Sequence, residues 1–323
     1  MSKKQPAERW YEMKEKRHTA GLALTFALLK ILPSAAVRAI AFPVGFFYWL
    51  FGKKTRAVSR QYLQHVNAVR VKNGQPPLKI STLKHIVSFA ITLTEKLEVW
   101  AGKFSFRQIH FQDDDTGDLV QNLENGRGVM LFISHLGNSE LLRGLASAHE
   151  TGVTKPFVVN SIINMSVTAG FNALLKKINA DATMNIISAN DISPDTMIML
   201  QEKVAGGEMV VIAGDRTSAH TQTRFVAQDF LGEQAPFAYG AYLLCALLNV
   251  PTYFVFGIRQ KDVSLRPQYD FYARKCPVTF DCGRKEREER IRQTVAAYAH
   301  ELERHCLAHP YQWYNFFDFW AMP

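Results

Sequence analysis

Residues 129–144 read VMLFISHLGNSELLRG, and the hydrophobic pattern changes within this stretch. The first five residues are all apolar, which is typical of a strand buried on both faces of a sheet. Gly137 then permits a tight turn, and Asn138 is a residue type favoured at the start of a helix. From Ser139 onward the pattern of apolar and polar residues is helical. The stretch therefore predicts a buried strand, a turn that carries His135, and a helix.

The same alternation of short apolar runs and helical segments continues along the chain. We expect further strands at 107–111, 155–160, 184–188, 208–214 and 251–259, an edge strand at 263–273, and helices at 57–72, 79–101, 113–126, 138–149, 165–179, 193–205, 235–250 and 287–306. Strands that alternate with helices form βαβ units, whose strands lie parallel. The expected fold is therefore α/β, with a mixed, largely parallel sheet flanked by helices.

The N-terminal part has a different character. Its apolar runs at 20–29 and 39–52 are shorter than the roughly 20 residues that span a bilayer. Aromatic side chains gather in the second run, and basic residues follow it: Lys53, Lys54 and Arg56. This combination is typical of helices that lie in the membrane interface, although a helical hairpin packed on the protein's own core is the alternative. We expect residues 1–56 to be a polar N-terminus with membrane-docking helices that do not span the bilayer, and 57–323 to be the α/β domain.

Composition and charge narrow the class of partner only partly. The chain has 323 residues, 47% of them hydrophobic, so a sizeable core is expected. The formal net charge of +9 suits an anionic lipid surface, nucleic acid or an acidic protein. The sequence contains no recognised nucleic-acid-binding motif and no stretch of interleaved basic and aromatic residues, so we expect no nucleic acid partner.

The cysteines indicate no metal site. They form no C-x-x-C pair, and their spacing to the nearby histidines fits no standard zinc pattern. Reduced thiols in a cytosolic environment are the expected state. The four residues are Cys245, Cys276, Cys282 and Cys306.

His135 and Glu140 could form a catalytic pair. Residues five apart on one continuous helix do not share a face, but a helix that begins after Asn138 leaves His135 outside it and free to fold back. The helix dipole would keep Glu140 ionised, so that it could accept a hydrogen bond from one imidazole nitrogen and leave the other as a base. The alternative is that Glu140 merely stabilises the helix N-terminus.

A histidine–carboxylate pair without a serine or cysteine nucleophile suits direct transfer. The histidine would remove a proton from a substrate hydroxyl or amine, and that group would attack an activated acyl carbon. The chain contains no G-x-S-x-G sequence.

Two later segments could belong to the same site. AGDRTS at 213–218 places Asp215 and Arg216 at the end of the sheet that carries His135, if the two strands run parallel. An arginine there could hold a phosphate or carboxylate, or stabilise charge in the transition state; a structural Asp–Arg pair is the alternative. The apolar segment at 230–256 could line a trough for an acyl chain, with plain core as its alternative.

Taken together, these blocks resemble a known family. SHLGNSE, GDRTS and FLGEQAPFAYGAYLLCALLNVPTYFVF are similar, in this order, to blocks of the lysophospholipid acyltransferase superfamily. The closest resemblance is to its bacterial lipid A late acyltransferase branch, of the lauroyl or myristoyl type, or to a side branch of it. The ending HPYQWYNFFDFW at 309–320 is also similar, but its residues from Asn315 to Asp318 replace an arginine-rich end. Lipid A itself as the acceptor is therefore not assumed.

The resemblance implies a membrane-associated acyltransferase with its catalytic domain at 57–323. It would move a fatty acyl group from an acyl thioester, on acyl carrier protein or coenzyme A, to a hydroxyl or amine of a lipid or glycolipid acceptor, without a cofactor. His135 would be the general base and Glu140 its partner. The residues expected to bind substrate are Asn138, Asp215, Arg216, Gly232, Ala235 and Pro236.

The expected location is the cytoplasmic face of the bacterial inner membrane, with peripheral or monotopic attachment. Acyl carrier protein is the expected protein partner, because it is strongly acidic and this chain is basic. The competing hypothesis is a non-catalytic lipid-binding or membrane scaffold protein with the same fold.

Overall fold

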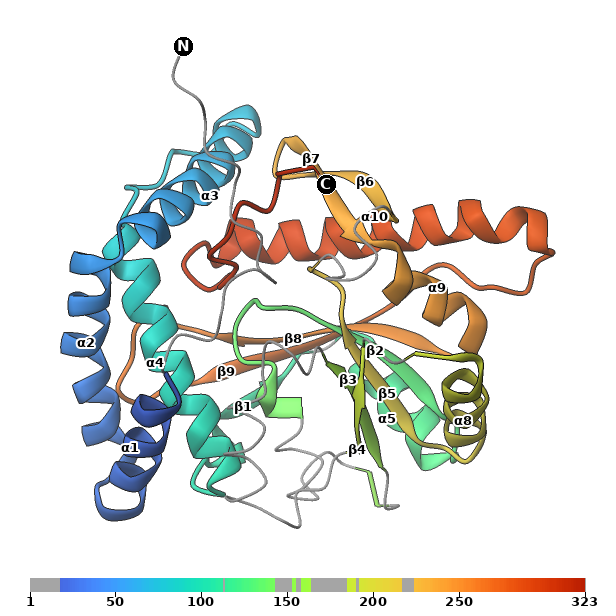
Figure 1. The fold of residues 1–323 in the computed structure, drawn as a ribbon, viewed down its shortest axis with the longest axis horizontal. Helices are drawn as coiled ribbons and strands as arrows, with labels where there is room; N and C mark the ends of the chain where they lie inside the picture. The colour runs from blue at the N-terminus through green and yellow to red at the C-terminus, as the bar shows by residue number, and fades with distance from the viewer. Residues whose placement is uncertain are drawn as a thin grey trace.

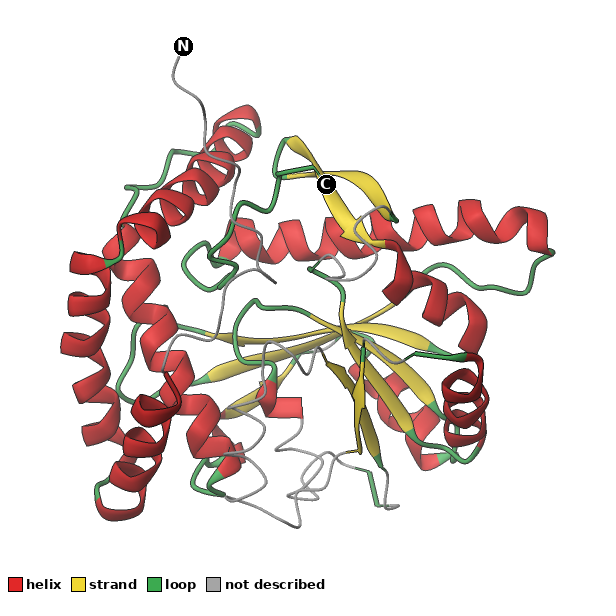
Figure 2. Cartoon of the chain, in the orientation of Figure 1, coloured by secondary structure: helices red, strands yellow, loops and turns green. Residues whose placement is uncertain are grey.

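A computed structural model describes residues 18–112, 114–142, 153–154, 158–163, 185–189, 192–216 and 224–322. In this part of the chain a central sheet has helices on both faces, and a group of helices from the N-terminal part packs at one side (Figures 1 and 2). The sheet strands are β1 (Ile109–Phe111), β2 (Val129–Ile133), β3 (Val159–Ile163), β4 (Asn185–Ser188), β5 (Met209–Ala213), β8 (Thr252–Arg259) and β9 (Tyr269–Lys275). A separate hairpin consists of β6 (Phe225–Phe230) and β7 (Glu233–Ala238).

The described helices surround this sheet. They are α1 (His18–Ile31), α2 (Ser34–Phe51), α3 (Lys53–Lys72), α4 (Thr82–Trp100), α5 (Thr116–Glu124), α8 (Pro194–Ala205), α9 (Tyr239–Leu248) and α10 (Arg284–Ala308), with a short 3-10 turn at Phe106–Gln108. Local sequence signals determine where two of these helices begin. The Ser81 hydroxyl accepts the backbone N–H of Lys84 at the start of α4. The Ser193 hydroxyl caps α8 in the same way, with Pro194 at its first position.

The sheet is mixed and largely parallel, as predicted. Its strand order is β1-β9-β8-β2-β5-β3-β4, and every neighbouring pair is parallel except β8 and β9. β2 lies in the interior of the sheet, between β8 and β5. Its five residues are those of the apolar run VMLFI, because both faces of the strand are covered.

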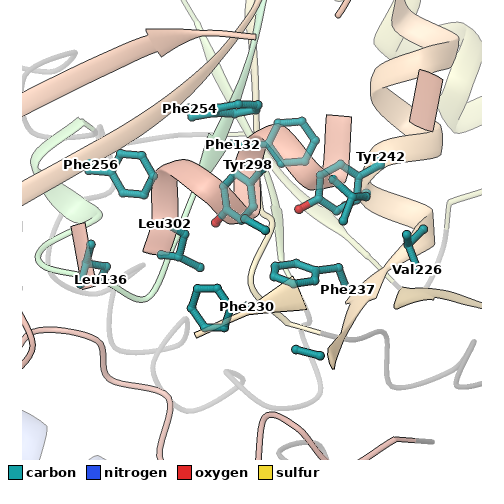
Figure 3. Close-up of a cluster of buried hydrophobic side chains, with 14 of the residues drawn as sticks. Phe132, Leu136, Val226, Phe230, Phe237, Tyr242, Phe254, Phe256, Tyr298 and Leu302 are labelled. Atoms are coloured by element: carbon teal, nitrogen blue, oxygen red, sulfur yellow. The ribbon is translucent and has the colours of Figure 1, made fainter. Parts of the chain in front are cut away.

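Side chains alternate along β2 between two cores. Met130 and Phe132 point into a core with residues of α3, α9, α10 and the β6–β7 hairpin. Figure 3 shows the ring of Phe132 beside that of Tyr298 from α10. Val129 and Leu131 point into the opposite core, which α5 and the end of α4 cover. β2 is thus packed on both faces, and the residues that follow it start from a fixed position.

The α2 helix packs on α4 through one face and exposes the other. On the inner face Arg38 is 5% exposed and forms an ion pair with the buried Glu98 of α4, and Gly45 lies close to the backbone of Val87. The outer face carries exposed apolar side chains: Ile40, Val44, Phe46, Phe47, Tyr48, Leu50 and Phe51. This helix has 18 residues and a mean hydropathy of 1.4, and in the described part of the chain it is the one helix long and apolar enough to cross a membrane. It is longer than the run at 39–52 suggested, because its first turn starts at Ser34.

The helix predicted at 235–250 is wrong in its first part. Its first residues belong to β7, and α9 starts only at Tyr239. β6, which was not predicted, pairs with β7 in antiparallel register, and Leu231 and Gly232 make the turn with positive φ angles. The ladder satisfies the backbone groups of β7, and Pro236 fits a hairpin strand better than a helix interior.

Other differences are shifts of boundary. The strand expected at 155–160 is β3 at Val159–Ile163, and the edge strand expected at 263–273 is β9, which starts at Tyr269. α3 begins at Lys53, so residue 56 lies inside this helix, and the division of the chain at that position stays a prediction. The helix predicted at 165–179 lies outside the described residues, as does most of the one at 138–149.

Candidate active site

The register of two parallel strands brings His135 and Asp215 together. Ile133 of β2 pairs with Ala213 of β5, and each of the two residues lies two positions past this pair. The backbone N–H of Gly214 donates to the carbonyl of Ile133, which extends the ladder by one step. Nδ1 of His135 lies 2.8 Å from Oδ1 of Asp215, and the backbone N–H of His135 donates to Oδ2 at 2.7 Å. The expectation that both residues share one end of the sheet is confirmed.

The environment of Asp215 determines which imidazole nitrogen can act as a base. Burial would raise the pKa of this fully buried carboxyl, but attraction to His135 and the hydrogen bonds that it accepts from His135 and Trp313 outweigh burial, so its pKa lies below the ordinary value. An ionised carboxylate only accepts hydrogen bonds, so Nδ1 of His135 carries the proton and Nε2 has the lone pair. The His135 side chain is 29% exposed, so this histidine is partly accessible.

His135 is neutral at physiological pH. Burial is the largest cause that lowers its pKa, and the positive charges of Arg216 and Lys96 lower it further. The charge of Asp215 and its hydrogen bond raise the pKa of His135, but by less than burial and the two positive charges together lower it. A neutral imidazole with a free Nε2 lone pair is the form that can remove a proton.

Side chains from the C-terminal part of the chain hold Asp215. The indole N–H of Trp313 donates to Oδ2 of Asp215 at 2.9 Å. The Asn315 amide lies 3.3 Å from the same oxygen and donates to the backbone carbonyl of Asp215 at 3.1 Å. These two residues were not predicted from the sequence to belong to the site. The only signal was the unusual aromatic and polar segment HPYQWYNFFDFW, which has no helical or strand period.

The turn that carries His135 is fixed by close backbone contacts. Gly137 has φ +66°, and a Cβ at this position would lie 2.0 Å from the carbonyl oxygen of Gly257. The backbone N–H of Asn138 donates to that same carbonyl at 2.8 Å. The Asn138 side chain accepts the N–H of Glu140 at 3.1 Å and so caps the helix that begins there. The tight turn and the cap agree with prediction; a role of Asn138 in substrate binding stays a prediction.

Glu140 has a different partner from the one expected. Its Oε2 accepts the indole N–H of Trp100 at 2.9 Å, and among the described residues no hydrogen bond joins it to His135. Trp100 and the neighbouring Leu141 belong to the core on the α5 side of the sheet. The first turn of the new helix therefore directs Glu140 toward that side, whereas Asp215 reaches the imidazole from the adjacent strand. The pairing with His135 is corrected to Asp215, and a catalytic role for Glu140 stays a prediction.

A small hollow opens beside Glu140, against residues of the parallel strands β2, β3 and β5. The lining residues in the described part of the chain are Ile133, Ser139, Glu140, Leu142, Val159, Ser161 and Val211. The residues described include no cluster of histidine, cysteine and carboxylate groups that could hold a metal ion.

Arg216 lies next to the histidine–aspartate pair. Its Nε donates to the Asn315 side chain at 3.3 Å, and its guanidinium lies 5.8 Å from the ring centre of Phe317. Burial lowers its pKa to about 10, with the charge of Asp215 acting against this, so it is positively charged at neutral pH. Among the described residues no salt bridge joins Arg216 to Asp215, and substrate binding by Arg216 stays a prediction.

The residues expected to bind the acyl chain form part of the hairpin. Gly232 makes the β6–β7 turn, and Ala235 and Pro236 are buried in β7. The flanking Phe230 packs against Trp313, so the hairpin covers the core beneath the C-terminal segment. Acyl binding by these residues stays a prediction.

Comparison with known protein families gives a match over most of the chain. A family model described as bacterial lipid A biosynthesis acyltransferase matches residues 13–321. No curated protein matches the chain.

Proposed function

The chain belongs to the bacterial lipid A biosynthesis acyltransferase family and is an acyltransferase, and from this we propose the reaction and the roles of its residues. A fatty acyl group moves from an acyl thioester to a hydroxyl or amine of a lipid-like acceptor. His135 is the general base, and Asp215 is the positioning residue that holds its imidazole.

The proposed chemistry needs one proton carrier. Nε2 of His135 takes the proton from the acceptor hydroxyl or amine, whose oxygen or nitrogen attacks the thioester carbonyl carbon. The new acyl bond forms and the carbon–sulfur bond breaks. The departing thiolate then takes the proton from the imidazolium, so the histidine is neutral again for the next turnover.

The observation that carries this proposal is the contact between Nδ1 of His135 and the ionised Asp215. It fixes the tautomer and favours the imidazolium that forms during the reaction. Arg216 contributes a positive charge beside the pair. We assign it to an anionic group of the donor or acceptor, or to the oxygen that becomes negative in the transition state.

Membrane attachment is the second part of the proposal. The exposed apolar face of α2 is followed directly by Lys53, Lys54 and Arg56 at the start of α3. Such a surface suits insertion at the level of anionic headgroups. The buried pair of Arg38 with Glu98 ties the other face of α2 to α4, which favours a helix that lies in the interface over one that leaves the protein to cross the bilayer.

The same features support a proposal for the location and the donor. We propose the cytoplasmic face of the bacterial inner membrane, where a thioester donor from the cytoplasm and a lipid acceptor can meet. Acyl carrier protein is the favoured donor over coenzyme A, because an acidic carrier is attracted to a chain with a formal net charge of +9.

The test uses the full chain in lipid nanodiscs with radiolabelled lauroyl-acyl carrier protein. A lipid A precursor and a lysophosphatidylethanolamine serve as separate acceptors. The parent is expected to give labelled lipid that grows with time, and folded His135→Ala is expected to give about 10²–10⁴-fold less. Parental rates of product formation in His135→Ala would contradict the proposal.

A further inference from the structure

The segment at 312–315 runs antiparallel to the turn that carries His135. The backbone N–H of Gly137 donates to the carbonyl of Gln312 at 2.8 Å, and the N–H of Tyr314 donates to the carbonyl of His135 at 2.9 Å. Between these bonds Leu136 and Trp313 form a bridge. Backbone hydrogen bonds to the segment at 312–315 therefore hold the turn that carries His135.

The body of the protein fixes the same segment from the other side. The Gln312 side chain accepts the backbone N–H of Arg259 at 3.0 Å and donates to its carbonyl at 2.6 Å. The imidazole of His85 in α4 lies 2.8 Å from the carbonyl oxygen of Trp313. The Tyr314 hydroxyl lies 2.9 Å from the hydroxyl of Ser88, also in α4. The segment's position is thus set by β8 and α4 and not by a substrate.

Two donors from this segment reach Asp215. Trp313 is 1% exposed and Asn315 is 2% exposed, so neither side chain offers a surface to a substrate. Their N–H groups donate to Oδ2 of Asp215, the oxygen that also accepts the backbone N–H of His135. With Oδ2 occupied by these donors, Oδ1 is the oxygen directed at Nδ1.

We propose that Trp313, assisted by Asn315, is a positioning residue: it holds the Asp215 carboxylate in the rotamer that keeps His135 in its Nδ1–H form. This rests on the proposed function, in which His135 is the base. The effect passes through Asp215, so it acts on turnover and on the proton affinity of His135, and it leaves substrate binding nearly unchanged.

The direction of the pKa effect follows from the charges around the imidazole. The charged groups that influence it are Asp215, Arg216 and Lys96. A donor on the carboxylate withdraws negative charge from it, so removal of the Trp313 N–H makes Asp215 attract the imidazolium more strongly. The pKa of His135 should rise, and the less restrained carboxylate should orient the imidazole less well.

The test compares Trp313→Phe with the matched control Trp320→Phe. Trp320 also donates its indole N–H to a buried acceptor, the carbonyl of Phe230, and packs in the same aromatic cluster without a bond to the pair. In Trp313→Phe we expect kcat to fall about tenfold with KM nearly unchanged, and the acid limb of the rate profile to move to higher pH. Trp320→Phe is expected to match the parent in both respects.

A second readout does not need acyl transfer. NMR titration of ¹⁵N-histidine-labelled full chain, with the His135 signal assigned by His135→Gln, should show a raised His135 pKa in Trp313→Phe and none in Trp320→Phe. The same His135 pKa in the parent and in Trp313→Phe would overturn the inference, whether or not the parent transfers acyl groups. If Trp313→Phe does not fold, the same titration is made with β-benzothienylalanine at position 313, which keeps the shape of the tryptophan side chain and lacks only the N–H that donates to Asp215.

Discussion

Nδ1 of His135 lies 2.8 Å from Oδ1 of Asp215, although 80 positions separate the two residues in the chain. The carboxylate that is nearest in sequence, Glu140, accepts its hydrogen bond from Trp100 instead. Which carboxylate orients the base is therefore decided by strand register and not by local spacing.

The first prediction separates these two carboxylates by the titration of His135. Asp215→Asn removes the charge that raises the pKa of His135, so this pKa should fall further below its ordinary value. Glu140→Gln should leave it close to the parental value. NMR titration of labelled histidine measures both variants. A shift in Glu140→Gln as large as that in Asp215→Asn would restore Glu140 as the partner.

The second prediction concerns the pH dependence of the reaction. The base must be neutral, and the pKa of His135 lies below 6.5, so kcat/KM should be flat through neutral pH and fall only as the pH drops below that value. On the alkaline side a loss is expected as the pH rises through about 10, where Arg216 loses its proton. A pH–rate profile with saturating donor tests this. An acid limb centred above pH 7 would argue against a buried His135 base.

The third prediction concerns Arg216. Arg216→Ala should raise KM and lower kcat/KM by about 10–100-fold, because a charge-assisted contact with the substrate is lost. Arg216→Lys should recover only part of this, since an ammonium cannot form a bidentate pair. Steady-state kinetics and thermal melts are measured on the same preparations. Loss of thermal stability in proportion to loss of activity would support a structural role.

The fourth prediction tests the exposed face of α2 as a membrane surface. Val44→Glu should reduce binding to phosphatidylglycerol vesicles about tenfold, since a charge replaces a side chain that enters the interface. Ile198→Glu in α8 is the matched control, because Ile198 is 56% exposed and Val44 is 58% exposed. Vesicle co-sedimentation at two ionic strengths gives the binding. Equal binding by the two variants would count against docking through α2.

The fifth prediction concerns stability in acid. His85 is fully buried, and burial lowers its pKa from 6.5 to about 4. Between pH 4 and pH 6.5 the unfolded chain therefore binds more protons than the folded protein. The stabilisation that comes from keeping His85 neutral is complete above about pH 6.5 and is lost as the pH falls toward 4. The depression corresponds to about 3 kcal/mol.

The comparison that checks this uses melts of His85→Gln and of His300→Gln, whose side chain is 78% exposed in the parent. The stability difference between parent and His85→Gln should shrink from pH 7 to pH 4.5, while His300→Gln should follow the parent. A constant difference would mean that His85 titrates normally in the folded protein.

The parts of the fold that were predictable are those with a local cause. The run VMLFI predicted β2 to the residue, because a strand covered on both faces must be apolar throughout. The turn after it was predictable because only glycine fits at position 137 and Asn138 is a favoured cap. The hairpin strand β7 was missed because its residues continue into an apolar helix, and only its pairing with β6 shows that they are extended.

The candidate site shows the same division. The sequence placed His135 and Asp215 at one end of the sheet but could not rank Asp215 above Glu140 as partner, since that depends on the pairing of Ile133 with Ala213. Trp313 and Asn315 could not be assigned because their contacts depend on where the C-terminal segment crosses β2 and β8. Contacts made across the sheet have no local sequence signal.

The backbone contact between Gly137 and Gly257 also indicates where such a sequence can diversify. A Cβ at Gly137 would meet the Gly257 carbonyl at 2.0 Å, and one at Gly257 would meet the Asn138 carbonyl at 2.9 Å, so neither position accepts a larger residue without moving the loop. The neighbouring hollow is lined by side chains of the core on the α5 side, such as Leu142 and Val159, so a substitution there changes side-chain packing and not the backbone of the loop. Substitutions can therefore accumulate in the side chains around that hollow while the loop that presents the histidine keeps one geometry.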